Sequence, residues 1–175
     1  MADPDSPGRR AALVEVRIAA PGWRRALRNP VGWCRRAALA ALAAGGAEPL
    51  VELSLVLADD ATLAALNRRY RAKEGPTNVL SFPAEAPAGS PRLLGDVVLA
   101  LETARREARA ERLPLSEHAA HLVAHGVLHL LGYDHRTPAE ERRMNRCVGR
   151  ALEKLGVPAP GAAAGRRAPI EGLWA

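Results

Sequence analysis

An eleven-residue stretch, HGVLHLLGYDH at residues 125–135, constrains the fold of this chain more than any other. His125 and His129 are four residues apart, so on an α-helix they lie on the same face and can turn towards one ion. His135 can join them only if the chain leaves the helix and folds back. Gly132 supplies the exit, because glycine readily adopts the left-handed conformation that often follows a helix. The stretch therefore predicts a helix, a turn and a metal site of three histidines.

His121 offers a rival ligand set with His125 and His129. The eight residues from His121 to His129 span about 12 Å of helix, whereas zinc holds imidazole nitrogens at about 2.0–2.1 Å. We therefore expect His121 to line the pocket or to support the ligands, and the spacing gives no role to His118. Three histidine ligands leave one coordination position open, as in catalytic zinc sites, so we expect one zinc ion per chain.

The same spacing occurs in zinc proteases, whose pattern H-E-x-x-H-x-x-G-x-x-H places a glutamate, the general base, after the first histidine. Gly126 occupies that position here. A zinc-dependent hydrolase of peptide or amide bonds remains an alternative, as does a non-catalytic module in which zinc stabilises a ribosome- or RNA-binding surface. Asp134 is the nearest carboxylate, and it could orient a ligand histidine, act as the base or stabilise a turn.

Composition predicts one globular domain with an anionic partner. The chain has 175 residues, 48% of them hydrophobic, and a formal net charge of +6. Of its 25 basic residues only Lys73 and Lys154 are lysines, so codon bias is a competing explanation for the charge. From the sequence we expect no membrane span and no secretory signal, and the two cysteines, far apart, suggest no disulfide. We therefore expect a cytoplasmic protein.

Polarity patterns predict interleaved strands and helices. Strands are expected at 11–19, 50–58, 77–82 and 93–100, and helices at 30–44, 60–71, 102–112, from 116 through the motif, and from 138 to about 155. This order indicates an α/β (α+β) fold, a single domain with a small four-stranded mixed sheet packed with about five helices. We expect residues 1–9 to be a flexible leader, 10–156 the domain and 157–175 a disordered tail.

The motif resembles the hallmark of the YbeY family, bacterial metal-dependent endoribonucleases that act in ribosomal RNA maturation. Two further blocks, LNRRYR with PTNVLSFP (66–83) and LGDVV (94–98), follow the family order, and the likeness spans roughly residues 50–155. It implies an α/β fold with a small mixed sheet, a zinc ion held by the three motif histidines, and an arginine, Arg71, that is needed for activity. Ala72 departs from the family, where glycine is common at this position.

The resemblance also implies the function: a single-strand-specific, zinc-dependent endoribonuclease that acts in small-subunit ribosomal RNA maturation and ribosome quality control. Its partners would be precursor ribosomal RNA and the ribosome or its associated proteins, with no membrane and no DNA. An arginine fork at Arg71 suits a phosphate. Aromatic residues make up only 3% of the chain, which argues against a stacking platform for bases. The predicted contacts to the RNA backbone are Arg24, Arg25, Arg28, Arg68 and Arg69.

Overall fold

The computed structural model describes residues 12–85 and 92–158. Their elements, in chain order, are β1 (Leu13–Ile18), α1 (Gly22–Ala26), α2 (Pro30–Ala44), β2 (Val51–Ala58), α3 (Asp60–Arg71), β3 (Val79–Pro83), β4 (Arg92–Ala100), α4 (Leu101–Ala110), α5 (Leu115–Leu130) and α6 (Pro138–Lys154). The predicted leader at 1–9 lies outside the described residues, as does the predicted tail beyond residue 158. Val157, the first residue of that predicted tail, is buried in the core.

The four strands form one mixed sheet in the order β1-β2-β4-β3. β1, β2 and β4 run parallel, and β3 pairs antiparallel with β4 as an edge strand. The predicted α/β class and four-stranded mixed sheet are therefore confirmed. The described residues form six helices, where about five were expected, because the five-residue α1 was not predicted. Its Trp23 is fully buried and donates its indole N–H to the Ala58 carbonyl at 2.8 Å.

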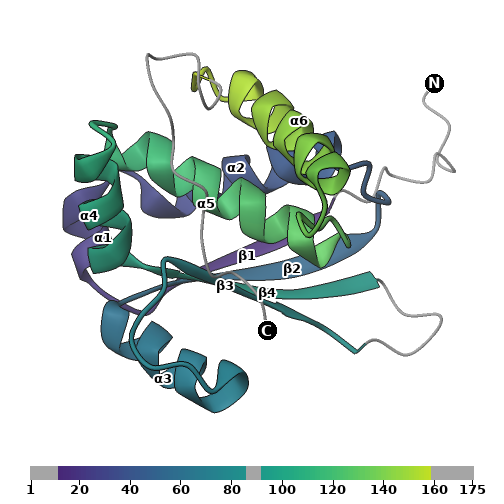
Figure 1. Cartoon of the computed structure of the whole chain (residues 1–175). Coiled ribbons are helices and arrows are strands. Elements are labelled where there is room, and N and C mark those ends of the chain that lie inside the picture. Colours follow the sequence, from purple (N-terminus) through teal and green to yellow (C-terminus); the bar gives the residue numbers. More distant parts are fainter. Residues whose placement is uncertain (1–11, 86–91, 159–175) are drawn as a thin grey trace, which may run out of the picture.

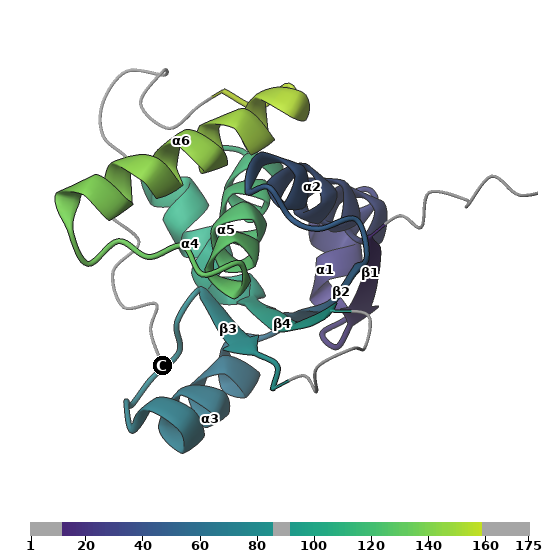
Figure 2. The ribbon, with the colours of Figure 1, turned by 90° about the vertical axis from the view of Figure 1, so that its right-hand side faces the viewer.

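Helices cover both faces of the sheet, and Figures 1 and 2 show α2, α5 and α6 on one side and α3 on the other. Alternation along β4 produces the two layers, because successive side chains of a strand point to opposite faces. Val97 and Leu99 join the main core with α2, α5 and α6, whereas Val98 and Ala100 pack in a smaller cluster with Leu63 of α3. β3, at one edge of the sheet, is the strand at which the α5 face and the α3 face meet.

Side-chain caps fix where three of the helices begin. Asn29 accepts a hydrogen bond from the Gly32 amide before α2, and Asp59 accepts one from the Thr62 amide before α3. Thr137 forms a reciprocal capping box with the third residue of α6. All three starts agree with the predicted helices. Across 12–85 and 92–158, no helix combines the length and the apolar character that a membrane crossing requires.

Candidate metal centre

Three histidines meet at the C-terminal end of α5. His125 and His129 project from its last turns, and His135 returns from the loop that follows. One ring nitrogen from each lies within 4.8 Å of the other two, and the first two side chains are buried. Gly132 makes the turn with a φ of 88°, a left-handed conformation that L side chains rarely adopt. The predicted spacing therefore brings these three residues, and not His121, into one group that could hold an ion.

The ring of His129 is oriented by the backbone of the loop. Its Nδ1 lies 2.6 Å from the carbonyl oxygen of Tyr133, and because a carbonyl only accepts, Nδ1 carries the hydrogen. The lone pair of Nε2 then points towards Nε2 of His125 at 2.9 Å. Two nitrogens bound to one tetrahedral zinc would be about 3.3 Å apart, so the spacing fits a shared ion.

Burial keeps the two helix histidines neutral, which is the form that binds a metal. Burial lowers the pKa of His129 to about 3, against an ordinary 6.5. Burial, and then the neighbouring charges of His129 and His135, hold the pKa of His125 well below its ordinary value. These two imidazoles are therefore ready to coordinate an ion without losing a proton.

The loop that carries His135 is tied to two helices through Tyr133. The Tyr133 hydroxyl donates to the Gly45 carbonyl, at the end of α2, at 3.1 Å. The guanidinium of Arg143 in α6 lies 5.0 Å from the centroid of the tyrosine ring. A hydrogen bond with Cys147 and partial burial raise the pKa of Tyr133. The sequence did not single out this tyrosine, because the carbonyl that accepts its hydroxyl hydrogen bond lies 88 positions away in the chain.

A row of histidines continues along α5 from this group. The ring of His121 stacks beside His125 with centroids 6.3 Å apart, and His118 stacks beside His121 at 6.4 Å. His118 is buried, and its Nε2 lies 2.7 Å from a carboxylate oxygen of Glu107, which Asn78 also binds. His121 therefore lies next to a member of the group, as expected of a supporting residue. The sequence analysis gave His118 no role, although its spacing of three residues from His121 was a signal that the two share one face of α5.

Gly126, where a protease has its glutamate, is packed directly against the sheet. A Cβ at this position would lie 2.6 Å from Cγ1 of Val97 and 3.1 Å from Oγ of Ser81. The Ser81 hydroxyl also donates to the Gly126 carbonyl at 3.0 Å. The absence of a side chain is thus a packing requirement, and a glutamate has no room here.

Arg71 is the last residue of α3, so its helix lies across the sheet from the histidine group (Figure 1). Nη1 of Arg71 lies 3.4 Å from the side-chain oxygen of Asn67. Asn67 is buried, and its amide donates to the Gly75 carbonyl at 3.0 Å, which ties the helix end to the next loop. Ala72 ends the helix with a φ of 50°, a left-handed conformation that favours glycine. β3, which follows α3 in the chain, is an edge strand of the sheet.

The contacts of Asp134 favour the turn-stabilising interpretation. One carboxylate oxygen accepts the backbone N–H of His135 at 2.7 Å, and the other lies 2.7 Å from Nε of Arg136. The carboxylate thus fixes the backbone that carries a ligand histidine. Its role as a general base stays a prediction.

The five arginines predicted to contact RNA are exposed and belong to two regions. Arg24 and Arg25 are in α1, and Arg28 follows it. In α3, Arg68 pairs with Glu74 at 3.5 Å, and the guanidinium of Arg69 lies 5.2 Å from the Tyr70 ring.

The mixed-sheet α/β fold and the cluster of three imidazoles define a candidate metalloenzyme. The family model described as Endoribonuclease YbeY matches residues 28–156, and the chain belongs to this family of endoribonucleases. The Endoribonuclease YbeY of Paramagnetospirillum magneticum is 46% identical over 84% of this chain and 94% of its own length. That of Parvibaculum lavamentivorans is 42% identical over 91% of this chain and 96% of its own length.

The fold has a structural relative as well. The solution structure of a protein from Thermotoga maritima superposes with a TM-score of 0.53 at 20% identity. The match covers 89% of this chain and 100% of that one. This likeness concerns the fold alone.

Proposed function

We propose that the protein is a zinc-dependent endoribonuclease that cleaves single-stranded RNA, with His125, His129 and His135 as the metal ligands. The observation that carries the proposal is the meeting of three imidazoles at one point in a member of an endoribonuclease family. A bound zinc ion would supply a Lewis acid that polarises a phosphoryl oxygen or lowers the pKa of water. Three nitrogen ligands with a fourth position open suit zinc in such a role.

The residues of the chain would then divide the remaining tasks. The carbonyl of Tyr133 holds the His129 ring in the tautomer that presents Nε2. Arg71 would bind the phosphate, because its planar guanidinium can donate two parallel hydrogen bonds to phosphate oxygens. We assign Asp134 to holding the loop, because its oxygens face the His135 amide and Arg136.

Preference for a single strand is supported by the position of β3. The histidine group lies on the α5 side of the sheet, and Arg71 belongs to the helix on the other side. A strand of RNA that contacts both must bend around the β3 edge. An unpaired strand bends there easily, whereas a duplex is stiff over tens of nanometres. Two exposed arginines, Arg68 and Arg69, belong to the same last turn of α3 as Arg71.

We place the activity in maturation of small-subunit ribosomal RNA and in ribosome quality control in the cytoplasm, with the ribosome as partner. The support is the resemblance to a family with that role and the net charge of +6, which favours a polyanion. A peptide hydrolase is disfavoured, because Gly126 stands where its general base would be. A side chain at this position would collide with Val97.

The test compares unstructured RNA, duplex RNA and casein as substrates. We expect cleavage of the unstructured RNA alone, loss of cleavage with a chelator and recovery with zinc. His129→Ala and Arg71→Gln should each lower kcat by about a hundredfold or more. Arg150 is an exposed arginine of α6, and Arg150→Gln serves as the control that should leave the rate unchanged. Circular dichroism would verify folding, and chelator-sensitive cleavage of casein without cleavage of RNA would contradict the proposal.

A further inference from the structure

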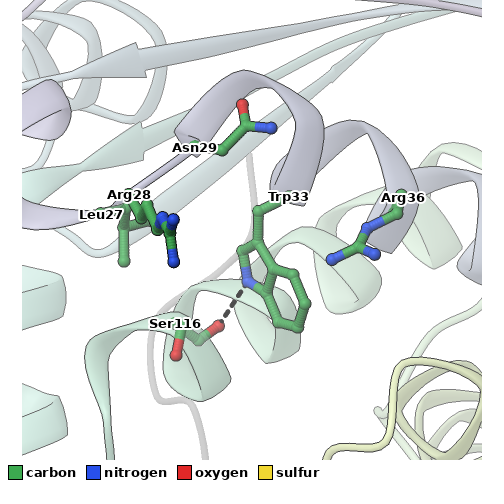
Figure 3. A pocket seen from close by; sticks show the side chains of 6 residues that line it. All are labelled: Leu27, Arg28, Asn29, Trp33, Arg36 and Ser116. Carbon is green, nitrogen blue, oxygen red and sulfur yellow. Dashed lines mark hydrogen bonds between the residues drawn. The ribbon is translucent and has the colours of Figure 1, made fainter.

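A pocket opens beside the first turn of α5 (Figure 3). Its volume is about 570 Å³, within the range of roughly 300–1,000 Å³ usual for small-ligand sites. One aliphatic residue, one indole, two arginines and two uncharged polar residues form its wall. They are Leu27, Arg28, Asn29, Trp33, Arg36 and Ser116.

The indole in this wall is held rigidly. Nε1 of Trp33 donates to the backbone carbonyl of Ser116 at 2.8 Å, so α2 and α5 fix the ring together. The Arg36 guanidinium lies 5.0 Å from the ring centroid. Figure 3 shows Arg28 and Arg36 on either side of the indole. The ring is only partly buried and both arginines are exposed, so all three remain accessible to a ligand.

These side chains match the two parts of a nucleotide. A fixed aromatic ring provides a surface on which a base can stack, and such stacking tolerates any base. Arginine forks bind phosphate, and none of the six lining residues is acidic. We propose that this pocket binds one unpaired nucleotide of the RNA substrate, with its base against Trp33 and its phosphate bound by the flanking Arg28 or Arg36.

The pocket is separate from the histidine group. Ser116 and His125 are nine residues apart on α5, which is two and a half turns and about 14 Å along the axis. The two residues therefore lie on opposite sides of the helix. A nucleotide in the pocket is not the one that is cleaved, and it serves as a remote anchor that strengthens RNA binding.

This inference rests on RNA as the substrate, as in the proposed function, but its test does not require cleavage. Binding of a short fluorescent single-stranded RNA is measured by anisotropy in the presence of a chelator. Replacing Arg28 and Arg36 together by glutamine should weaken binding by about tenfold. The matched control replaces Arg105 and Arg109, two exposed arginines of α4, by glutamine, and should change affinity by less than about twofold.

Trp33 variants separate stacking from charge. Trp33→Leu should weaken RNA binding by about tenfold, and Trp33→Phe should restore most of it, because phenylalanine keeps an aromatic face. Thermal unfolding of each variant verifies that the fold is retained. If Trp33→Leu is folded and binds RNA normally, the stacking assignment is wrong.

The remaining outcomes are also decisive. Equal weakening by the two arginine pairs would show a general charge effect and would overturn the pocket. Adenosine monophosphate that shifts the Trp33 indole signal in NMR, while RNA affinity stays unchanged in the Arg28/Arg36 variant, would make a free nucleotide the ligand and overturn the RNA assignment. Loss of RNA binding in that variant, with His129→Ala still cleaving RNA, would support the pocket and refute only the proposed metal ligands.

Discussion

Gly126 shows how one missing side chain shapes both the fold and the chemistry. With no Cβ at this position, α5 can approach β3 and β4 so closely that the Ser81 hydroxyl reaches the Gly126 carbonyl. The residue lies between the histidine that begins the motif and the valine that follows, in the middle of a buried helix. The same contact that brings the helix onto the sheet removes the general base of a protease from the site.

We predict that Gly126→Ala destabilises the protein by about 1–3 kcal/mol, because its methyl group would overlap Cγ1 of the fully buried Val97. The change in the free energy of unfolding would be measured in urea. Gly149→Ala is the control, since Gly149 lies within α6 and a Cβ there meets nothing within 4 Å. That variant should instead gain about 0.5–1 kcal/mol from helix propensity. A stabilised Gly126→Ala protein would refute the close approach.

The turn between α5 and α6 is the element on which the metal group depends. His129 is in the helix, but the hydrogen bond that orients its ring comes from the loop, through the Tyr133 carbonyl. The same tyrosine anchors the loop to the end of α2 through its hydroxyl. Three segments are thus joined at one residue, and displacement of the loop would affect both His129 and His135.

Tyr133→Phe removes only the hydroxyl, and we expect the dissociation constant for zinc to rise by about tenfold, as for other residues that position metal ligands. Competition with a chromophoric chelator would measure it. Tyr70→Phe is the matched control, because Tyr70 is the other tyrosine and is exposed on α3. It should leave zinc affinity unchanged. Equal effects of the two substitutions would argue against an anchoring role for the Tyr133 hydroxyl.

At the scale of the whole molecule, zinc should link binding to folding, because the three histidines meet only in the folded chain. At a free zinc concentration one hundred times the dissociation constant, the free energy of unfolding should rise by about 2.7 kcal/mol. Urea unfolding in zinc buffer and in chelator would measure the difference. His129→Ala should abolish the gain, and a gain that survives this substitution would place zinc elsewhere.

The sequence predicted the periodic elements well, because helix starts and strand polarity are local properties. Asn29, Asp59 and Thr137 cap α2, α3 and α6, which begin where helices were expected. The short α1 was missed because its structure depends on burial of Trp23, a tertiary contact. The strand order, with β3 at the edge, could not be predicted either, because it depends on how distant segments pair.

The histidine group was predictable for a related reason, and the pocket at Trp33 was not. Two of the three histidines are one helical turn apart, and Gly132 marks the reversal that brings back the third, so the pattern lies within eleven residues. The pocket at Trp33 joins α2 to the start of α5, residues separated by 83 positions in the chain. The low aromatic content argued against base stacking. Composition alone could not reveal that one indole lies between two arginines.

The position of the histidine group at the end of α5 has an electrostatic consequence. The peptide dipoles of a helix align, and together they place about half a negative elementary charge at its C-terminus. α5 has 16 residues, and its last turns carry His125 and His129. The ion would therefore lie in a field that favours a cation, although its three ligands are uncharged. The helix itself thus provides part of the negative charge that carboxylate ligands supply in other metal sites.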